Sequence, residues 1–359
     1  MSRFLPVASS VYRWLEQRLP VASVADYFSK KVVPRHKHSF WYYFGGLTLF
    51  FFIIQLISGI LLALYYNPTQ EHAYESVRII INEVPYGWLI RSVHSWSANL
   101  MVGTLFIHMF SALFMRAYRK PRELMWVSGV ILLFVTLGFG FTGYLLPWDT
   151  MAYFATLIGT EVPKTLPIVG DWGVSLLKGS GEVGAETLIR MYSIHIILLP
   201  LVALFLISFH LILNQILGSS VPIGTQVKDP PVPFFPNFLY RDLISWVLGF
   251  LVLISLSILA PWGLGEKADP LASAPLGIKP EWYFWPLYQS LKIIPPTVFS
   301  INGEMIVNGV LGIMSLFWLL IPFIDRKASI EQKSRPFTVV GAALVLYLIL
   351  MIGFAYFDI

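Results

Sequence analysis

The sequence contains no cysteine among its 359 residues. Disulfide bonds, thiolate metal sites and haem attached through thioether bonds are therefore excluded. Charged residues are also scarce, because Asp, Glu, Lys and Arg make up only 13% of the chain, against about 25% in an ordinary soluble domain. Hydrophobic residues make up 56%, and the mean hydropathy is +0.69. This composition is typical of a protein that lies within a membrane.

Long hydrophobic runs are abundant in the sequence. A helix needs about 20 apolar residues to cross the hydrocarbon of a bilayer. Windows of that kind lie at residues 44–66, 90–115, 126–146, 188–213, 241–260, 303–323 and 337–357. We therefore predict an all-α integral membrane protein with seven transmembrane helices. Two long loops, 147–187 and 261–302, are rich in Gly, Pro, Trp and charge.

The basic residues divide unevenly between the two sides of the membrane. With seven spans, residues 1–43, 116–125, 214–241 and 324–336 share one side and hold 17 of the 25 Lys and Arg residues. By the positive-inside rule, that side is the cytoplasm. We expect a multi-pass protein of a bacterial inner membrane, with 1–43 as a basic amphipathic arm and no removable signal peptide. The net charge of +5 then reflects orientation, and no nucleic-acid partner is expected.

Four of the seven histidines lie within two of the predicted spans. His94 and His108 are fourteen positions apart in the second span, and His195 and His210 are fifteen positions apart in the fourth. Both separations return close to the same face of a helix and set the rings about 21 Å apart along its axis. An ionisable side chain at membrane depth is costly and marks a functional site. A single such histidine could also bond one helix to another, but two matched pairs indicate a shared role.

The two spans run in the same direction, so His94 faces His195 near the outer side and His108 faces His210 near the inner side. Each pair can give two axial imidazoles to one haem iron, which leaves no open position and suits electron transfer. Zinc would need further ligands or an open position, and no Cys or carboxylate lies near these histidines in the sequence. We predict two non-covalent b-type haems with these four histidines as metal ligands.

Glycines in two other spans repeat the spacing of the histidines. Gly45 and Gly59 in the first span are fourteen positions apart, and so are Gly129 and Gly143 in the third. A flat macrocycle needs a close approach of the backbone, which glycine permits. Small residues also serve ordinary helix packing in lipid, but that role does not predict a shared period. We therefore predict that these glycines border the haems.

Two arginines lie near the outer histidine pair. Arg91 precedes His94 by three positions, and Arg190 precedes His195 by five. A guanidinium at this place can pair with a haem propionate, or it can anchor its helix at the membrane boundary. Both roles stay open for each arginine.

Two further motifs give the chain a resemblance to a known family. They are Pro147-Trp148-Asp149 after the third span and Pro280-Glu281-Trp282-Tyr283 in the second long loop. With the histidines and glycines, they make the chain resemble, along essentially its whole length, cytochrome b of the quinol:cytochrome c (or plastocyanin) oxidoreductases, the cytochrome bc family. The fifteen-position step from His195 to His210 is similar to the chloroplast-type branch, in which a four-helix cytochrome and a three-helix subunit are separate chains. The resemblance implies that the two are fused here, as a four-helix di-haem domain over 44–215 and a three-helix domain over 216–359.

The resemblance also implies an activity and partners. The chain would be the catalytic subunit that oxidises quinol at the outer face and passes electrons through two haems to quinone at the inner face, coupled to proton translocation. The implied partners are a Rieske iron–sulfur protein, a c-type cytochrome or similar acceptor, and a second copy of the chain in a homodimer.

The second long loop carries the candidate catalytic residues. Glu281 lies among Pro, Trp, Tyr and Phe beside the membrane, and apolar surroundings raise the pKa of a carboxyl, which suits proton transfer. Tyr283 offers a phenol to the same pocket. A structural loop whose aromatic residues pack at the membrane interface is the plainer alternative. The resemblance implies that this loop and residues 147–165 form the quinol-oxidising pocket, where Glu281 accepts a proton and Pro280 and Trp282 shape the loop.

The inner quinone site has weaker signals. Asp242 stands at the cytoplasmic start of the fifth span, and the resemblance links its position to proton uptake, although the helix dipole also favours an acid there. Arg35, Lys37 and His38 on the arm are weaker candidates. In the chloroplast-type branch a cysteine near the start of the first span tethers an extra haem. Tyr43 stands at that place here, so the tether is excluded.

Two other functions stay open from the residues alone. A di-haem membrane anchor of a dehydrogenase or hydrogenase would pass electrons to quinone without splitting them, but it would not need the loop at 280–283. A proton-coupled transporter could relay protons through its intramembrane histidines. It would be expected to show broken helices and internal repeats, which the sequence does not display convincingly.

Overall fold

The structure, a computed structural model, describes residues 10, 11, 13–19, 23, 26, 30–165, 170–179, 181–332 and 335–358. Within them, seven helices are long and apolar enough to cross a membrane, so the seven predicted spans are confirmed. These spans are Ser39–Ala63, Gly87–Phe114, Glu123–Tyr144, Ala185–Leu217, Phe234–Leu259, Gly303–Ala328 and Arg335–Phe357. The protein is an integral membrane protein built of helices. The arm predicted for residues 1–43 lies partly outside the described residues and stays a prediction.

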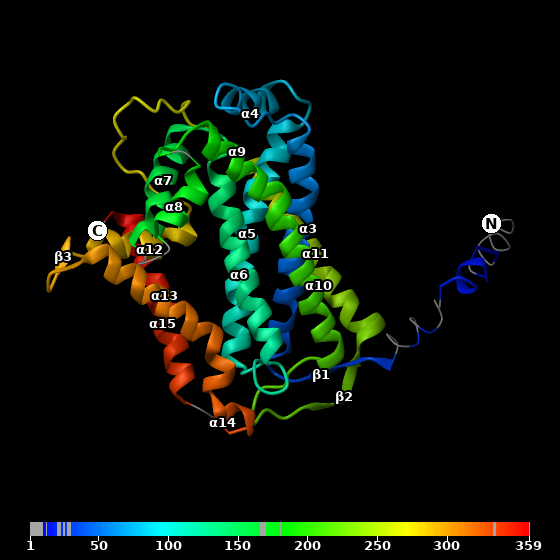
Figure 1. The fold of residues 1–359 in the computed structure, drawn as a ribbon. Coiled ribbons are helices and arrows are strands. Elements are labelled where there is room, and N and C mark those ends of the chain that lie inside the picture. The colour runs from blue at the N-terminus through cyan, green and yellow to red at the C-terminus, as the bar shows by residue number, and fades with distance from the viewer. Residues whose placement is uncertain are drawn as a thin grey trace.

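The spans pack as a four-helix bundle with three further helices against it (Figure 1). Their principal helices are α3 (Tyr43–Ala63), α5 (Gly87–Phe114), α6 (Glu123–Tyr144), α10 (Leu199–Leu217), α11 (Leu239–Leu259), α13 (Gly303–Ile324) and α15 (Arg335–Phe357). In the bundle, α3 packs along α5 and α10 packs along α6. On its outside, α11 contacts α3 and α5. The last two helices lean away from the bundle in Figure 1, and α13 contacts α6 while α15 contacts α5.

Short helical segments extend four of the spans. They are η1 (Ser39–Tyr42) before α3, α9 (Ala185–Ser193) and η3 (Ile194–Leu198) before α10, η4 (Phe234–Phe238) before α11, and α14 (Arg326–Ser329) after α13. Of these, η3 is a π-helical turn inside the fourth span. It contains one of the candidate haem ligands.

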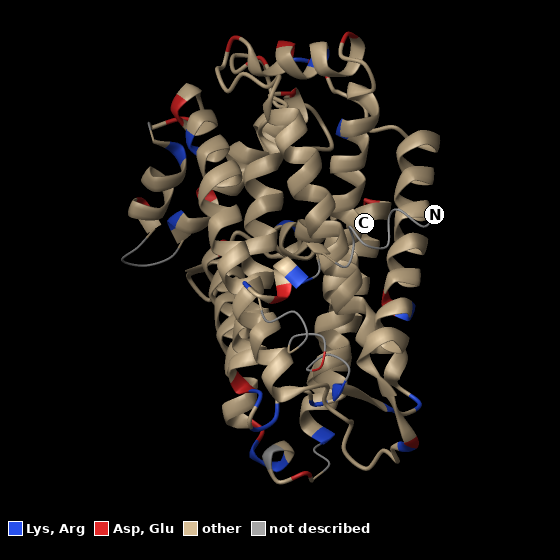
Figure 2. Cartoon of the chain, turned by 90° about the vertical axis from the view of Figure 1, so that its right-hand side faces the viewer, with Lys and Arg blue, Asp and Glu red and all other residues tan. Residues whose placement is uncertain are grey.

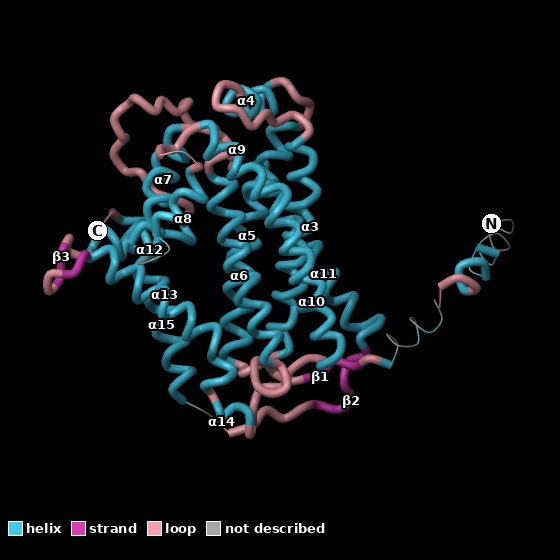
Figure 3. Tube along the Cα trace, in the orientation of Figure 1, coloured by secondary structure: helices cyan, strands magenta, loops and turns pink. Residues whose placement is uncertain are grey.

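The connections gather at two ends of the molecule, which we name the α4 end and the β1 end (Figures 1 and 3). The α4 end carries α4 (Ala73–Asn82), α7 (Thr150–Glu161), η2 (Val162–Thr165) and α8 (Gly170–Lys178). The segment between α11 and α13 starts there and holds η5 (Trp282–Phe284), α12 (Trp285–Ile293) and the hairpin of β3 (Thr297–Val298) and β4 (Ile301–Asn302). The β1 end carries α14 and the antiparallel pair of β1 (Val32–Arg35) and β2 (Lys228–Pro233). Lys and Arg gather at the β1 end (Figure 2).

The outward faces of the spans are hydrophobic. On α10, Phe205 is 70% exposed and Ile216 is 71% exposed, and on α13 Ile313 is 69% exposed. Large apolar side chains at this exposure are unfavourable in water, whereas a helix with satisfied backbone hydrogen bonds presents them to lipid without cost. The surface therefore agrees with the assignment as membrane spans.

One hydrophobic cluster divides the bundle into two levels. It is built around Phe51, Met101, Ala203 and Leu253. Met101 lies midway between the two histidines of α5, and Ala203 lies between the two histidines of the fourth span. The packed layer thus separates an upper from a lower pair of histidines. Two other clusters lie toward the α4 end and the β1 end, around Leu188 and Trp126 respectively.

Candidate functional site

Four histidines meet in two pairs inside the bundle. His94 on α5 faces His195 in η3, with ring centres 6.4 Å apart and ring planes inclined by 67°. His108 on α5 faces His210 on α10, with ring centres 6.5 Å apart and planes inclined by 77°. The structure thus brings together the two pairs that the spacing predicts, one toward each end of the bundle.

The separation within each pair fits one metal atom between two imidazoles. Two metal–nitrogen bonds of about 2 Å, plus about 1 Å from each ligating nitrogen to its ring centre, give about 6 Å between ring centres. Among the described residues no third His, Cys, Asp or Glu joins either pair in a possible metal site. Two histidines alone suit an iron whose other four positions are filled by a porphyrin. The four histidines are therefore able to hold two haems.

A π-helical turn explains why the histidines of the fourth span are one position further apart than those of the second. At about 100° per residue, a step of fourteen ends about 40° short of a whole number of turns, and a step of fifteen ends about 60° beyond it. In η3 the N–H of Leu199 donates to the carbonyl of Ile194, so the turn absorbs one extra residue. Pro200 follows and has no N–H to continue the regular pattern. The longer step from His195 to His210 therefore ends on nearly the same helix face as the shorter step from His94 to His108. A residue count that assumes a regular helix leaves this turn out.

Hydroxyl groups determine which ring nitrogen carries the proton in three of the four histidines. The hydrogen-bonded pairs are Ser58 Oγ with His94 Nδ1 (2.9 Å), Ser128 Oγ with His210 Nδ1 (2.9 Å) and Thr142 Oγ1 with His195 Nδ1 (3.1 Å). Each hydroxyl donates its own hydrogen to a backbone carbonyl of its helix, that of Ile54, Met125 or Gly138. Its oxygen must therefore accept the hydrogen of Nδ1, which leaves Nε2 free to bind iron.

These hydroxyl residues were not predicted from the sequence, although it holds a signal for them. Ser58, Ser128 and Thr142 each directly precede one of the four glycines that share the histidine period. At the remaining glycine, Gly45, the preceding residue is Phe44. A hydroxyl residue directly before three of the four glycines indicates that hydroxyl groups serve as partners of the histidines.

The four predicted glycines stand opposite the four histidine rings. A Cβ atom added to the glycine would lie 3.0 Å from Cε1 of the ring for Gly45 and His108, 3.3 Å for Gly59 and His94, 3.4 Å for Gly129 and His210, and 2.6 Å for Gly143 and His195. The sequence predicted that these glycines let a haem approach the backbone. In the structure they make room for the ligand rings themselves, and the room is smallest at Gly143.

Gly143→Ala is expected to reduce the haem bound by His195. A new Cβ atom 2.6 Å from the ring would force His195 to move, because real Cβ atoms do not come so close, and the ring would then point away from the iron. We expect a loss of about half of the b-type absorbance in a reduced-minus-oxidised spectrum, because one of two bis-histidine sites is affected. Gly138→Ala on the same helix is the matched control, since its Cβ would make an ordinary 3.6 Å contact with Leu199. Full absorbance in the Gly143 variant would contradict this role.

The two arginines near the pair of His94 and His195 bond to backbone carbonyls. Arg91 is 8% exposed, and its Nη1 donates to the carbonyls of residues 262 and 263 at 2.5 and 2.9 Å. Nη1 of Arg190 donates to the carbonyls of residues 175 and 176 at 3.1 and 2.9 Å. Both guanidinium groups therefore tie a long loop to the bundle at the α4 end. Pairing with a haem propionate stays a prediction for both.

The Pro147-Trp148-Asp149 motif connects α6 to the loop that follows α11. Trp148 is 1% exposed and has a φ of +52°, which is uncommon for a residue with a side chain. Its carbonyl accepts the N–H of Ala268 at 3.1 Å. Oδ1 of Asp149 accepts the N–H of Ala152 at 2.9 Å and so caps α7. The motif therefore holds two loop segments together at the α4 end.

Glu281 and Tyr283 lie in buried surroundings beside α6. Burial raises the pKa of Glu281 to about 7, so this carboxyl can exchange a proton near neutral pH. Burial and then the nearby carboxyl of Glu281 raise the pKa of Tyr283, which therefore stays a hydrogen-bond donor. A Cβ atom on Gly140 would overlap the phenol of Tyr283. Gly140 precedes Gly143 by three positions on one face of α6, so Tyr283 lies about one turn from the glycine that borders His195.

Two indole groups hold this loop in place. Nε1 of Trp285 donates to the carbonyl of Pro280 at 2.7 Å, which closes the loop on itself. Nε1 of Trp282 donates to Oδ1 of Asn99 at 2.7 Å. Asn99 stands on α5 between its two candidate ligand histidines. The loop that carries Glu281 is therefore bonded to the helix that supplies one ligand to each pair, and the sequence analysis did not identify Asn99.

Asp242 lies toward the β1 end, where α11 contacts α3. A Cβ atom on Gly46 would come within 2.5 Å of both carboxyl oxygens of Asp242. Gly46 is next to Gly45, which borders His108, so the carboxyl lies close to the level of the pair of His108 and His210. Oδ1 of Asp242 and Nε1 of Trp246, one turn further along α11, are buried and have no hydrogen-bond partner in the described part of the chain. The sequence analysis did not identify Trp246.

The weaker candidates on the arm are placed near the β1 end. Arg35 lies in β1 and is exposed, as is Lys37. The backbone N–H of His38 donates to Nδ1 of His36 at 3.1 Å. Tyr43, at the position of the tethering cysteine of the chloroplast-type branch, stacks on Phe238 with ring centres 5.2 Å apart. These contacts give the arm candidates no assigned role, and they stay predictions.

Two family models match the chain one after the other. The model described as "Cytochrome b/b6/petB" matches residues 28–217, which end with α10, and so it covers the four-helix bundle. The model described as "Cytochrome b(C-terminal)/b6/petD" matches residues 267–357, from the loop of Glu281 to the end of α15. The chain belongs to the cytochrome b family. Its members bind haem b, and the two histidine pairs are where this chain's own residues fit that group.

Similar proteins agree with the assignment to the cytochrome b family. A "Cytochrome bc complex cytochrome b subunit" from Chlorobaculum thiosulfatiphilum is 52% identical over 346 residues, which cover 95% of this chain and 79% of that protein. A "Cytochrome b6" from Cyanothece sp. is 45% identical over 216 residues, covering 60% of this chain and 96% of that protein. A structure called "Hyperthermophilic respiratory Complex III" matches with a TM-score of 0.83 and 29% identity, over 96% of this chain and 91% of that chain.

These matches confirm the fused arrangement and exclude the other functions considered. A cytochrome b6 of nearly full length corresponds to only 60% of this chain, and the remainder matches the second family model. The four-helix cytochrome and the three-helix part are therefore joined in one chain, as the resemblance implied. Neither a dehydrogenase anchor nor a proton-coupled transporter fits membership of the cytochrome b family.

Proposed function

We propose that this chain is the di-haem subunit of a cytochrome bc complex that oxidises quinol at the α4 end and reduces quinone at the β1 end. The observation that carries the proposal is the position of Tyr283 against Gly140, about one turn of α6 from Gly143 and His195. This position puts the loop that carries the protonatable carboxyl of Glu281 beside the pair of His94 and His195. Two similar proteins are named for a cytochrome bc complex and for a respiratory Complex III, which supports membership of a multi-subunit complex.

The loop residues would handle one of the two protons of quinol, and the other proton leaves to water at the α4 end. Oxidation of quinol to quinone releases two electrons and two protons. Glu281 accepts one proton, because its pKa of about 7 leaves a large fraction as carboxylate at neutral pH. The phenol of Tyr283 donates a hydrogen bond to a quinol oxygen and orients the head group against α6. His94 with His195 and His108 with His210 would each hold one non-covalent haem, and the two haems would supply one-electron transfer between the two levels of the bundle.

At the other level, Asp242 would serve the reduction of quinone. Its carboxyl is buried beside Gly46, next to the glycine that borders His108. A carboxyl with one oxygen free of hydrogen bonds can hold a proton and deliver it to a quinone oxygen. The proton taken up at this end and the proton released at the α4 end make the cycle electrogenic.

The partners and orientation follow from the same proposal. A Rieske iron–sulfur protein docks at the α4 end, takes the first electron and passes it to a c-type cytochrome or a plastocyanin-like acceptor, and two copies of the chain form a homodimer. The β1 end, where Lys and Arg gather (Figure 2), faces the cytoplasm of a bacterial inner membrane. Moving one charge across 100 mV then costs about 2.3 kcal/mol, which the redox reaction must supply.

The test of the proposal is oxidant-induced reduction of the b haems. In the purified complex, with the inner quinone site inhibited, quinol is expected to reduce the b haems only when the acceptor of the first electron is oxidised. Adding an oxidant of the c-type cytochrome should therefore increase the b-type absorbance. If quinol reduced the haems equally with the acceptor reduced or oxidised, the chain would be a simple electron wire and the splitting of the two electrons would be refuted.

A further inference from the structure

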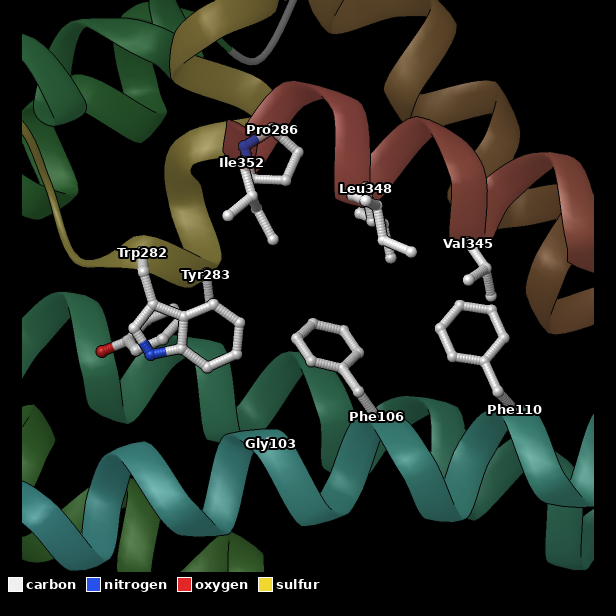
Figure 4. Close-up of a pocket in the computed structure, with 10 residues that line it drawn as sticks. Gly103, Phe106, Phe110, Trp282, Tyr283, Pro286, Val345, Leu348 and Ile352 are labelled. Carbon is white, nitrogen blue, oxygen red and sulfur yellow. The ribbon is translucent and has the colours of Figure 1, made fainter. Parts of the chain in front are cut away.

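A cavity of about 190 Å³ lies between α5, α15 and the loop that carries Tyr283 (Figure 4). Gly103 forms its floor, and Phe106 and Phe110 line it along α5. Leu348 and its neighbours on α15 close the opposite wall. The cavity therefore runs along the middle of two transmembrane helices, at the depth of the hydrocarbon.

The wall of the cavity offers only hydrocarbon to an occupant. None of its lining side chains is charged, and the polar side-chain atoms of Trp282 and Tyr283 are directed toward other parts of the protein. Nε1 of Trp282 is bonded to Asn99. The hydroxyl of Tyr283 lies against Gly140 on α6, and in Figure 4 the only side-chain oxygen drawn points away from the two phenylalanines. A polar group would lose its hydrogen bonds with water on entering and gain none, so the occupant is apolar.

The ring of Tyr283 is the boundary between this cavity and the candidate quinol site. Its ring lines the cavity, while its hydroxyl lies on the side of Gly140 and shares its surroundings with Glu281. A molecule with a polar head beside Glu281 and an apolar chain attached would therefore reach the cavity past this ring. The volume is suitable, because a cavity of about 150 Å³ can hold a benzene, and one to two five-carbon units fit in about 190 Å³.

We propose that this cavity binds the first isoprenoid units of the tail of quinol. The inference rests on the proposed function, since it needs a quinol head group beside Glu281 and Tyr283. It adds that the enzyme recognises the tail as well as the head, on the side of α5 and α15. The acyl chain of a membrane lipid has the same chemistry, and the experiment below separates the two.

Gly103 provides a direct test because it leaves open space where a side chain would stand. An added Cβ atom would meet nothing within 4 Å, so the backbone at Gly103 accepts a side chain that then extends into the space of the cavity. Gly312 on α13 also has nothing within 4 Å of an added Cβ atom and does not line the cavity. Gly312→Leu is therefore the matched control for Gly103→Leu.

The experiment compares a long-tailed quinol with a quinol whose tail is replaced by a methyl group, in the purified whole complex. Gly103→Leu is expected to raise KM for the long-tailed quinol about tenfold, or about 1.4 kcal/mol, and to leave KM for the tail-less quinol unchanged. Gly312→Leu should change neither. Gly103→Ala and Gly103→Val form a graded series in case the leucine variant does not assemble, and the haem spectrum reports assembly.

Three outcomes would overturn the proposal. Equal KM values for the long-tailed quinol in all variants would show that the tail does not enter the cavity. An equal rise for both quinols would show that the substitution disturbs the head-group site instead. Loss of a copurifying phospholipid from Gly103→Leu without a change in KM would assign the cavity to a lipid. Failure of the proposed function itself is distinguished by Glu281→Gln, which would then leave oxidation of both quinols intact.

Discussion

His94→Leu is expected to remove one of the two haems and to stop quinol oxidation. Leucine has no atom that can coordinate iron. His195 would then be the one histidine left at this site. We expect b-type absorbance to fall to about half, because the pair of His108 and His210 is separated from this level by the packed layer around Met101. Turnover should fall by more than about a hundredfold, since the second electron of quinol loses its acceptor. Both are measured on the purified complex, by a reduced-minus-oxidised spectrum and by cytochrome c reduction.

His72→Leu is the control for this variant. His72 is an exposed residue just before α4, and its side chain does not cap the helix. Its replacement should leave both the spectrum and turnover unchanged. Retention of full b-type absorbance in His94→Leu would mean that this imidazole is not a ligand, and the assignment of the pair of His94 and His195 would have to be abandoned.

Glu281→Gln is expected to lower quinol oxidation about a hundredfold, in the range by which general acid–base groups accelerate reactions. Glutamine keeps the shape of the side chain but cannot accept a proton. Because burial raises the pKa of Glu281 to about 7, the carboxyl is protonated below that pH and cannot serve as a base. The rate of the unmodified protein should therefore rise as the pH increases through about 7, and the glutamine variant should lose this rise.

The control for this variant is Glu304→Gln, because Glu304 is an exposed acid in the first turn of α13. It should keep both the rate and the pH profile, which are measured by cytochrome c reduction between about pH 5.5 and 8.5. The haem spectrum of both variants should be unchanged, since neither residue belongs to the two histidine pairs. A glutamine variant with an unaltered pH profile would assign the titrating group to another residue.

Several features of the site could be read from local periodicity alone. The seven spans follow from apolar runs of sufficient length, and the pairing of His94 with His195 follows from spacing and direction along the chain. The period shared by Gly45 and Gly59 also depends only on the pitch of one helix. Such features are set by the geometry of single helices, which the sequence specifies directly.

Other features depend on which helices come to lie next to each other. The π-helical turn at Ile194–Leu198 changes the rotation of the fourth span, and its local signs are Pro200 after the turn and the extra position between His195 and His210. Asn99 gains its role from Trp282, which lies far away in the sequence. Arg91 looked suited to a propionate, yet its guanidinium donates to the carbonyls of a loop that follows α11. Neither the contact of Asn99 nor the contacts of Arg91 leave a periodic signal in the sequence.

The absence of cysteine and the scarcity of charge, together with the histidine and glycine periods, were enough to determine a membrane protein with two histidine pairs on two helices. The residues themselves carry that information, because burial in lipid and the pitch of a helix act on each segment separately. Only the tertiary structure decided that Ser58, Ser128 and Thr142 orient three of the rings, that Glu281 is buried enough to titrate near pH 7, and that open space remains beside Gly103. These properties arise where side chains from distant segments meet, and their hydrogen bonds, burial and packing exist only once the helices have assembled.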